Sequence, residues 1–102
     1  MFGFTKVKSV ATSEFEAHFK DKKVELLDVR EAHEFFTGHI KGARNVPLSQ
    51  IAKYAASANK KVFVICQSGV RSRQAYKILS RKGIDVTNIK GGMNAWRGKT
   101  VK

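Results

Sequence analysis

The sequence predicts an α/β fold with a central, mainly parallel five-stranded sheet and helices on both faces. Short apolar, β-branched runs alternate along the chain with longer segments in which apolar residues recur at helical spacing. The central runs are almost wholly apolar, which is typical of strands that are buried on both faces. Because helical segments separate successive strands, the connections are expected to be right-handed crossovers between parallel strands.

Five segments are expected to form the strands, and the first of them is the weakest because lysines alternate through it. The strands are residues 5–10, 24–29, 44–46, 62–65 and 84–89. Pro47, the only proline, closes the third strand, and Gly91 and Gly92 end the last one.

Five helical segments are expected between and after these strands. They are residues 12–20, 31–36, 48–58, 71–81 and 93–96. In the first, Ser13 is expected to cap the helix and Glu16 to complete a capping box, with Phe15 on the apolar face. Gly38 and Gly83 stand where the second and fourth helices should end.

The length of 102 residues fits a single monomeric domain, with a core at about residues 5–97 and a loose, basic tail at 98–102. No apolar run approaches the roughly 20 residues that a membrane helix needs. The N-terminus lacks the apolar segment of a signal peptide. Cys66 is the only cysteine, so it can form neither an internal disulfide nor a metal cluster. These features predict a cytoplasmic protein with no bound metal.

Charge is the unusual feature of the composition. Twenty Lys and Arg residues stand against eight Asp and Glu residues, which gives a formal net charge of +12. Such an excess favours anionic partners, among them small oxyanions, acidic proteins and nucleic acid. The lysines are dispersed, however, without a basic stripe interleaved with aromatic residues and without zinc-finger or helix-turn-helix spacing. Nucleic-acid binding is therefore a secondary hypothesis, and a solubilising surface is its alternative.

The strand at residues 62–65 leads into the most informative stretch of the chain. Cys66 stands where this strand ends, a polar turn follows, and a helix then begins. Gly69 lets the turn direct its amides inward, Arg71 adds a permanent positive charge, and the helix N-terminus adds its dipole. These features favour a reactive thiolate over the alternative of a small buried core residue, so Cys66 is the predicted catalytic residue. The predicted anion-binding loop comprises Gln67, Ser68, Gly69, Val70, Arg71 and Ser72.

The residues around Cys66 limit the reaction that it could perform. No histidine neighbours it in sequence, so a Cys–His acyl-transfer site lacks support. His18 and His33 are expected on the surface, and His39 is expected to fix its own loop by a hydrogen bond. An amide cup with an arginine instead suits an oxyanion that carries a transferable atom, and phosphate, arsenate and thiosulfate all qualify.

Three further motifs accompany the sequence Cys-Gln-Ser-Gly-Val-Arg-Ser at residues 66–72. They are Leu-Leu-Asp-Val-Arg-Glu at 26–31, a Gly-His-Ile segment within 34–47, and Gly-Gly-Met-Asn-Ala-Trp at 91–96. In this order, and across about Glu14 to Trp96, they resemble the active-site loop and flanking motifs of the rhodanese-like sulfurtransferases. The resemblance implies the rhodanese-like α/β fold.

The resemblance also implies a covalent, two-step transfer of sulfane sulfur. In it, the Cys66 thiolate attacks the outer sulfur of a donor such as thiosulfate, sulfite leaves, and Cys66 carries a persulfide. A thiophilic acceptor then removes the sulfur: cyanide in an assay, a thiol or a partner protein in a cell. The loop amides and the Ser72 hydroxyl would hold the persulfide, and Arg71 would hold the sulfonate end of the donor. No cofactor other than the persulfide is expected.

Three alternative functions stand beside this one. Phosphatases and arsenate reductases of this fold place five residues between cysteine and arginine, whereas only four separate Cys66 from Arg71, which makes a smaller cup. A non-catalytic docking or regulatory module is disfavoured because inactive family members usually lack the cysteine. A sulfur relay that serves tRNA or a tRNA-modifying protein would give the basic surface a role in docking.

Three more residues are candidates for the rim of the pocket. Arg30 follows a strand and could face the anion, although a local ion pair with Glu34, one helical turn away, is the favoured interpretation. Met93 and Trp96 match the last loop of the family, which lies near the site, and core packing is the equally weighted alternative.

Overall fold

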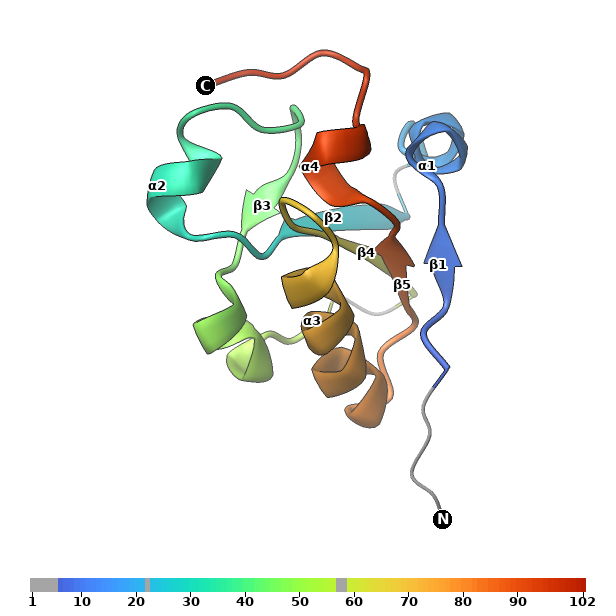
Figure 1. The fold of residues 1–102 in the computed structure, drawn as a ribbon. Coiled ribbons are helices and arrows are strands. Elements are labelled where there is room, and N and C mark those ends of the chain that lie inside the picture. Colours follow the sequence, from blue (N-terminus) through green and yellow to red (C-terminus); the bar gives the residue numbers. More distant parts are fainter. Residues whose placement is uncertain (1–5, 22, 57–58) are drawn as a thin grey trace.

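The computed structural model describes residues 6–21, 23–56 and 59–102, and it confirms the α/β fold (Figure 1). Among the described residues, the sheet has five strands in the order β1-β5-β4-β2-β3, and every strand pair is parallel. The strands are β1 (Ser9–Val10), β2 (Val24–Asp28), β3 (Arg44–Asn45), β4 (Lys61–Ile65) and β5 (Val86–Ile89). Each predicted strand is present with its ends moved by a few residues, and residue 5 lies outside the described part.

Helices cover both faces of the sheet, as predicted (Figure 1). They are α1 (Thr12–His18), α2 (Ala32–Phe35), the 3₁₀ helix η1 (Leu48–Lys53), α3 (Val70–Arg81) and α4 (Gly92–Ala95). Helices α3 and η1 pack on one face, and α1 packs on the other. Within the described residues, no helix combines the length and the apolar character needed to cross a bilayer.

The apolar core has one layer on each face of the sheet. Neighbouring residues of a strand point to opposite faces. Val64 of β4 accordingly packs with Leu79 of α3, whereas Phe63 packs with Phe15 of α1, at a ring-centroid distance of 5.1 Å. Strand β4 lies in the middle of the sheet, between β5 and β2, so the residue that follows it emerges at the centre of the carboxyl edge.

The start of α1 differs from the prediction. Ala11 is the N-cap, no side-chain cap hydrogen bond forms, and the Ala11 carbonyl accepts the Phe15 amide at 3.0 Å. The capping box predicted for Ser13 and Glu16 is therefore wrong. The physical reason is that the backbone is already helical at Thr12, which places Ser13 inside the first turn instead of before it.

The helix predicted at residues 48–58 is a shorter 3₁₀ helix. It ends at Lys53, Tyr54 is extended, and residues 57 and 58 lie outside the described part. The Tyr54 amide donates to the Ile51 carbonyl at 3.1 Å, the three-residue spacing of a 3₁₀ turn. This winding brings Ile51 and Tyr54 onto one buried face, which explains why the pair resembles the apolar face of an α-helix in the sequence.

The C-terminal tail is anchored, so the prediction of a loose tail is wrong. Val101 and His39 exchange two backbone hydrogen bonds of 2.8 Å each in an antiparallel bridge. The Trp96 indole N–H also donates to the Lys99 carbonyl at 3.1 Å. The basic composition of residues 98–102 describes only their side chains, whereas backbone pairing fixes the segment.

Candidate active site

Cys66 lies at the carboxyl end of the central strand β4, the edge at which parallel α/β sheets bind their ligands. The residue is buried, with 1% of its surface exposed. Gly69 is the N-cap of α3 and has a φ of +108°, a left-handed conformation that glycine adopts readily. This turn directs the Gly69 amide toward the Cys66 Sγ, to which it donates at 3.0 Å.

A hydroxyl group completes the immediate surroundings of the sulfur. Ser72, in the first turn of α3, is fully buried, and its Oγ lies 3.4 Å from the Cys66 Sγ. The hydroxyl also donates to the Gly69 carbonyl at 3.1 Å. Because a serine hydroxyl can rotate, the same group can accept from a thiol or donate to a negatively charged sulfur. The structure thus brings together the cysteine, the glycine amide and the serine of the predicted loop.

The N-terminus of α4 holds the first part of the loop. The amides of Met93 and Asn94 donate to the carbonyls of Cys66 and Gln67, at 2.8 and 2.9 Å. Gly92 permits this close approach, because a Cβ atom there would stand 2.3 Å from the Cys66 carbonyl oxygen. The first two carbonyls of the loop are therefore directed to α4, away from the sulfur.

Among the described residues, no other member of the predicted loop forms a hydrogen bond with the Cys66 Sγ. Ser68 and Val70 are exposed. Gln67 is half-buried; its amide nitrogen donates to the Asn94 side chain at 2.7 Å, and its amide oxygen accepts from Arg30 at 3.1 Å. Gln67 therefore connects the loop to α4 on one side and to the end of β2 on the other.

Arg30 is a buried connecting residue, with 3% of its surface exposed. Its guanidinium binds the fully buried carboxylate of Asp28, with 2.8 Å between Nη2 and Oδ2. It also donates to the Gln67 side chain and to the Gly38 carbonyl, at 3.1 and 2.8 Å. The predicted ion pair of Arg30 with Glu34 is wrong, because a buried carboxylate such as that of Asp28 requires a charged partner.

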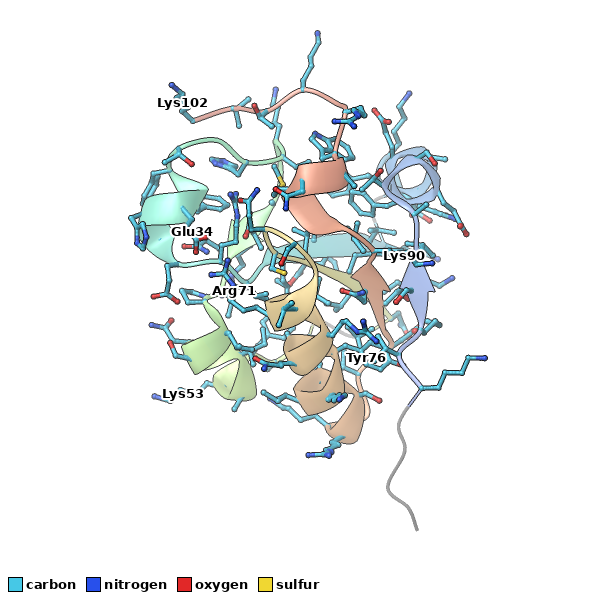
Figure 2. All side chains as sticks on the ribbon, viewed as in Figure 1. Glu34, Lys53, Arg71, Tyr76, Lys90 and Lys102 are labelled. Atoms are coloured by element: carbon cyan, nitrogen blue, oxygen red, sulfur yellow. The ribbon has the colours of Figure 1, made fainter. Side chains whose placement is uncertain are left out.

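Glu34 binds Arg71 instead, and Figure 2 shows the two side chains facing one another. Its two carboxylate oxygens accept from the two terminal guanidinium nitrogens at 2.6 and 2.9 Å. The hydrogen bond from Arg71 lowers the pKa of Glu34 from 4.5 to about 2, and the same bond raises the pKa of Arg71. Negative charge on Cys66 raises the pKa of Arg71 further.

The pair of Glu34 and Arg71 is the feature of the site that sequence reasoning missed. The two residues are 37 positions apart in the chain. They meet because β2 and β4 are neighbours in the sheet, so the helices that follow these strands begin at the same edge. One signal was present in the sequence: each residue stands in the first turn of a helix that comes directly after a strand.

Comparison with models of known protein families identifies the kind of domain to which this loop belongs. The model of the rhodanese-like domain matches residues 11–99. The chain belongs to the rhodanese-like family. The match covers strands β2 to β5, the Cys66 loop and α4, so it extends well beyond the motifs noted in the sequence.

Three relatives place this rhodanese-like chain among known proteins. The uncharacterized protein YqhL of Bacillus subtilis is 43% identical over 96 residues, which cover 91% of this chain and 75% of YqhL. Thiosulfate sulfurtransferase GlpE of Shewanella oneidensis is 33% identical over 78 residues, covering 74% of this chain and 77% of GlpE. The crystal structure of a rhodanese-related protein from Thermoplasma volcanium has a TM-score of 0.84 at 30% identity, covering 92% of this chain and 97% of that one.

In this rhodanese-like chain, the side chains of Met93 and Trp96 pack against the core on the α1 side of the sheet. The Trp96 ring lies 6.2 Å from the ring of Phe15. Met93 reaches the Cys66 loop through its backbone amide, as described above. The packing interpretation therefore accounts for the placement of both side chains.

The histidines of the rhodanese-like chain follow the prediction. The Nδ1 atom of His39 lies 2.9 Å from the Phe35 carbonyl oxygen, and its ring stacks on the Phe35 ring at 3.7 Å. His18 and His33 are exposed. His39 thus fixes the loop after α2, in keeping with its expected structural role.

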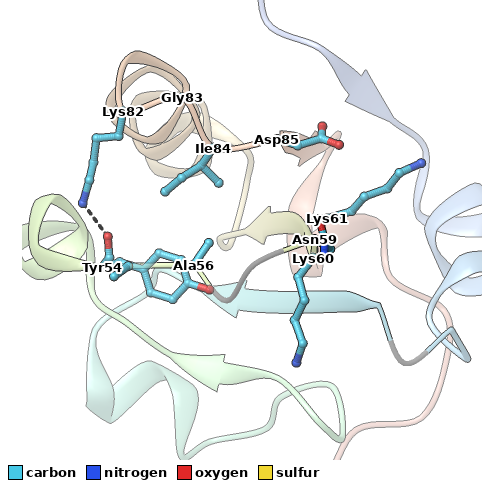
Figure 3. A pocket seen from close by; sticks show the side chains of 10 residues that line it. Tyr54, Ala56, Asn59, Lys60, Lys61, Lys82, Gly83, Ile84 and Asp85 are labelled. Atoms are coloured by element: carbon cyan, nitrogen blue, oxygen red, sulfur yellow. Dashed lines mark hydrogen bonds between the residues drawn. The ribbon is translucent and has the colours of Figure 1, made fainter.

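A cleft of about 620 Å³ lies at the amino end of the sheet (Figure 3). Its lining includes Lys60 and Lys61 at the start of β4 and Lys82 after α3, and the Lys82 ammonium donates to the Tyr54 carbonyl. Because Cys66 stands at the opposite end of β4, this cleft is separate from the candidate active site of the rhodanese-like domain.

A second cleft, of about 550 Å³, lies beside the first turns of α3. Four cationic side chains line it, from the segment before β1, from α3 and from the end of β5: Lys6, Lys8, Arg73 and Lys90. Lys90 immediately precedes the turn into α4, and Arg73 follows Ser72. The rhodanese-like domain therefore gathers four cationic side chains in one cleft beside α3.

Proposed function

We propose that this chain is a sulfurtransferase that carries sulfane sulfur as a persulfide on Cys66. The observation that supports it most directly is the hydrogen bond from the Gly69 amide to the Cys66 Sγ, 3.0 Å long, in a loop at the carboxyl end of β4. A fixed amide at this distance stabilises negative charge on sulfur. The relative named thiosulfate sulfurtransferase supports both the reaction type and thiosulfate as a donor.

The first step loads the cysteine. The Cys66 thiolate attacks the outer sulfur of thiosulfate, a new S–S bond forms, and the S–S bond of the donor breaks. The electron pair of that bond leaves with sulfite. Cys66 now holds a persulfide anion, and the total charge is unchanged, since a thiolate and a dianion become a persulfide anion and a sulfite dianion.

The second step removes the sulfur from Cys66. A nucleophilic acceptor, cyanide in an assay or a thiol in a cell, attacks the outer sulfur of the persulfide. The S–S bond breaks and its electron pair returns to Cys66 as a thiolate, while cyanide becomes thiocyanate. The first product leaves before the acceptor reacts, so the kinetics are of the ping-pong type.

The loop stabilises the charged sulfur of both steps. The Gly69 amide donates to the Sγ at 3.0 Å, and the Ser72 hydroxyl, whose Oγ lies 3.4 Å from the Sγ, can rotate to donate to it when the sulfur is negatively charged. The N-terminus of α3 adds its positive dipole end, and α4 holds the loop carbonyls away from the sulfur. The persulfide is the only carrier that the proposal requires, so we expect no metal or organic cofactor.

The cellular acceptor in this proposal is a protein thiol on an acidic surface. The support is the cleft beside α3, which four cationic side chains line. The net charge of +12 also favours association with acidic partners, because it attracts them electrostatically. We place the reaction in the cytoplasm and assign it to the monomer; nucleic acid is the alternative partner of the same cleft.

Two other functions receive less support. A phosphatase or arsenate reductase would need the Arg71 guanidinium for a tetrahedral oxyanion, yet its two terminal nitrogens are engaged by Glu34. A non-catalytic docking module would not require an amide and a hydroxyl positioned around a buried sulfur. The proposed sulfurtransferase uses both groups.

Initial-rate kinetics with thiosulfate and cyanide test the proposal. The wild-type protein is expected to release thiocyanate, with parallel lines in double-reciprocal plots at different cyanide concentrations. Cys66→Ser is expected to be inactive while it remains folded. Absence of thiocyanate from the wild type with every sulfane sulfur donor tried, or undiminished activity of Cys66→Ser, would rule the proposal out.

A further inference from the structure

The cation expected to hold the anionic end of the donor is already occupied. Both terminal nitrogens of Arg71 donate to Glu34, at 2.6 and 2.9 Å. Such a two-bond pair is the strongest common arrangement between a guanidinium and a carboxylate. An incoming anion at Arg71 therefore meets a neutralised guanidinium with a carboxylate directly beside it.

Glu34 is held in this place by α2. Its Oε1 atom also accepts the Glu31 amide at 2.9 Å, as half of the capping box that begins the helix. The next residue, Phe35, is buried and anchors the same turn. The side chains of Arg71 and Glu34 are only 32% and 26% exposed, so water screens their charges less than on an open surface.

We propose that Glu34 sets the charge selectivity of the donor site and favours singly charged sulfane sulfur donors over doubly charged ones. The singly charged class comprises organic persulfides and thiosulfonates, whereas thiosulfate is a dianion. This inference rests on the proposed sulfurtransferase function and assigns Glu34 a specificity role in it. A second negative charge a few ångströms from a partly shielded carboxylate lowers the relative efficiency of a donor roughly tenfold.

Thiosulfate and methanethiosulfonate form a matched pair of probes. In both, the Cys66 thiolate attacks the terminal sulfur and the S–S bond of the donor breaks. The electron pair leaves with sulfite in one case and with methanesulfinate in the other. Both reactions give the same persulfide on Cys66, and the donors differ by one charge and by the replacement of an oxygen with a methyl group.

Glu34→Gln removes the charge and keeps an amide oxygen that can accept the Glu31 amide. Glu14→Gln, on the exposed side of α1, changes the net charge equally and serves as the control. The quantity measured is the ratio of kcat/KM for thiosulfate to kcat/KM for methanethiosulfonate, with cyanide as acceptor. In Glu34→Gln this ratio is expected to rise roughly tenfold, mainly through a lower KM for thiosulfate, and to rise less in high salt.

Glu14→Gln is expected to stay within about twofold of the wild-type ratio, and Glu34→Asp, which keeps the charge, within about threefold. A ratio in Glu34→Gln equal to that of the wild type overturns the inference while the sulfurtransferase function stands. An equal loss of activity with both donors also overturns it, because Glu34 then only positions the loop. Failure of the wild type with both donors instead removes the proposed function itself.

Discussion

Asp28 and Arg30 form a buried ion pair at the carboxyl end of β2, with side chains 0% and 3% exposed and 2.8 Å between Oδ2 and Nη2. Arg30 also donates to Gln67 and to the Gly38 carbonyl, at 3.1 and 2.8 Å. The pair thus connects three segments: the end of β2, the Cys66 loop and the turn after α2. All of the guanidinium nitrogens of Arg30 are engaged in these contacts, which connect the loop to the rest of the fold.

Asp28→Asn is expected to lower the free energy of unfolding by about 3–5 kcal/mol, because it leaves the Arg30 charge buried without a counter-charge. Urea unfolding followed by circular dichroism measures this change. The control is Asp85→Asn, since Asp85 pairs with Lys8 at 3.1 Å on the surface, where the side chains are 54% and 58% exposed. That substitution is expected to lower the free energy of unfolding by less than about 1 kcal/mol. Equal losses in the two variants would contradict a buried structural role for Asp28.

Gly92→Ala is expected to destabilise the protein by about 2–4 kcal/mol and to slow persulfide formation, because its Cβ would stand 2.3 Å from the Cys66 carbonyl oxygen. Gly83→Ala is the matched control. Gly83 also has a positive φ, +82° against +58° for Gly92, but its Cβ would have no atom within 4 Å. In this control the free energy of unfolding is expected to fall by about 1 kcal/mol, and persulfide formation is expected to keep the wild-type rate. Indistinguishable rates of Gly92→Ala and the wild type would show that α4 does not hold the loop.

Ser72→Ala removes the hydroxyl that lies 3.4 Å from the Cys66 Sγ. The rate of persulfide formation, measured by stopped reactions and mass spectrometry, is expected to fall about tenfold, because the rotated hydroxyl can donate to the thiolate a hydrogen bond worth about 1.5 kcal/mol. Ser80→Ala, on the exposed side of the same helix, is expected to retain the wild-type rate. A wild-type rate in Ser72→Ala would mean that the amides of the loop suffice.

The pair of Glu34 and Arg71 gives the stability a specific dependence on pH. The pKa of Glu34 lies at about 2 in the folded protein, below its ordinary value of 4.5, so the carboxylate stabilises the fold above pH 4.5. This contribution is lost as the pH falls from 4.5 toward 2. After allowance for solvent screening, the free energy of unfolding of the wild type is expected to exceed that of Glu34→Gln by about 1–2 kcal/mol near neutral pH. A difference that stays constant down to pH 2 would show that the pair is not its source.

The central part of the fold follows from neighbouring residues and was predictable. The apolar run at 62–65, Cys66, the turn at Gly69 and the helical spacing after it are contiguous in the chain. Their local preferences agree with one another, and α3 begins at Val70, one residue from the predicted start. The loop could therefore be located from sequence because strand, turn and helix each depend on a short window.

The charge pairs of the site depend on which strands are neighbours. Arg30 binds Asp28 and Arg71 binds Glu34, whereas helical spacing alone favours a pair between Arg30 and Glu34. A spacing rule compares residues of one helix and contains no information about the order of β2 and β4. The bridge between His39 and Val101, which holds the C-terminal tail, was missed because it too joins segments that are far apart in the sequence.

The intact mass of the protein after incubation with thiosulfate tests the central claim most directly. The wild type is expected to gain the mass of one sulfur atom, located by peptide mapping on the segment that contains Cys66. Cyanide should remove this sulfur as thiocyanate, and Cys66→Ser should gain none. An unchanged wild-type mass with both thiosulfate and methanethiosulfonate, or the same gain in Cys66→Ser, would contradict a persulfide carried by Cys66.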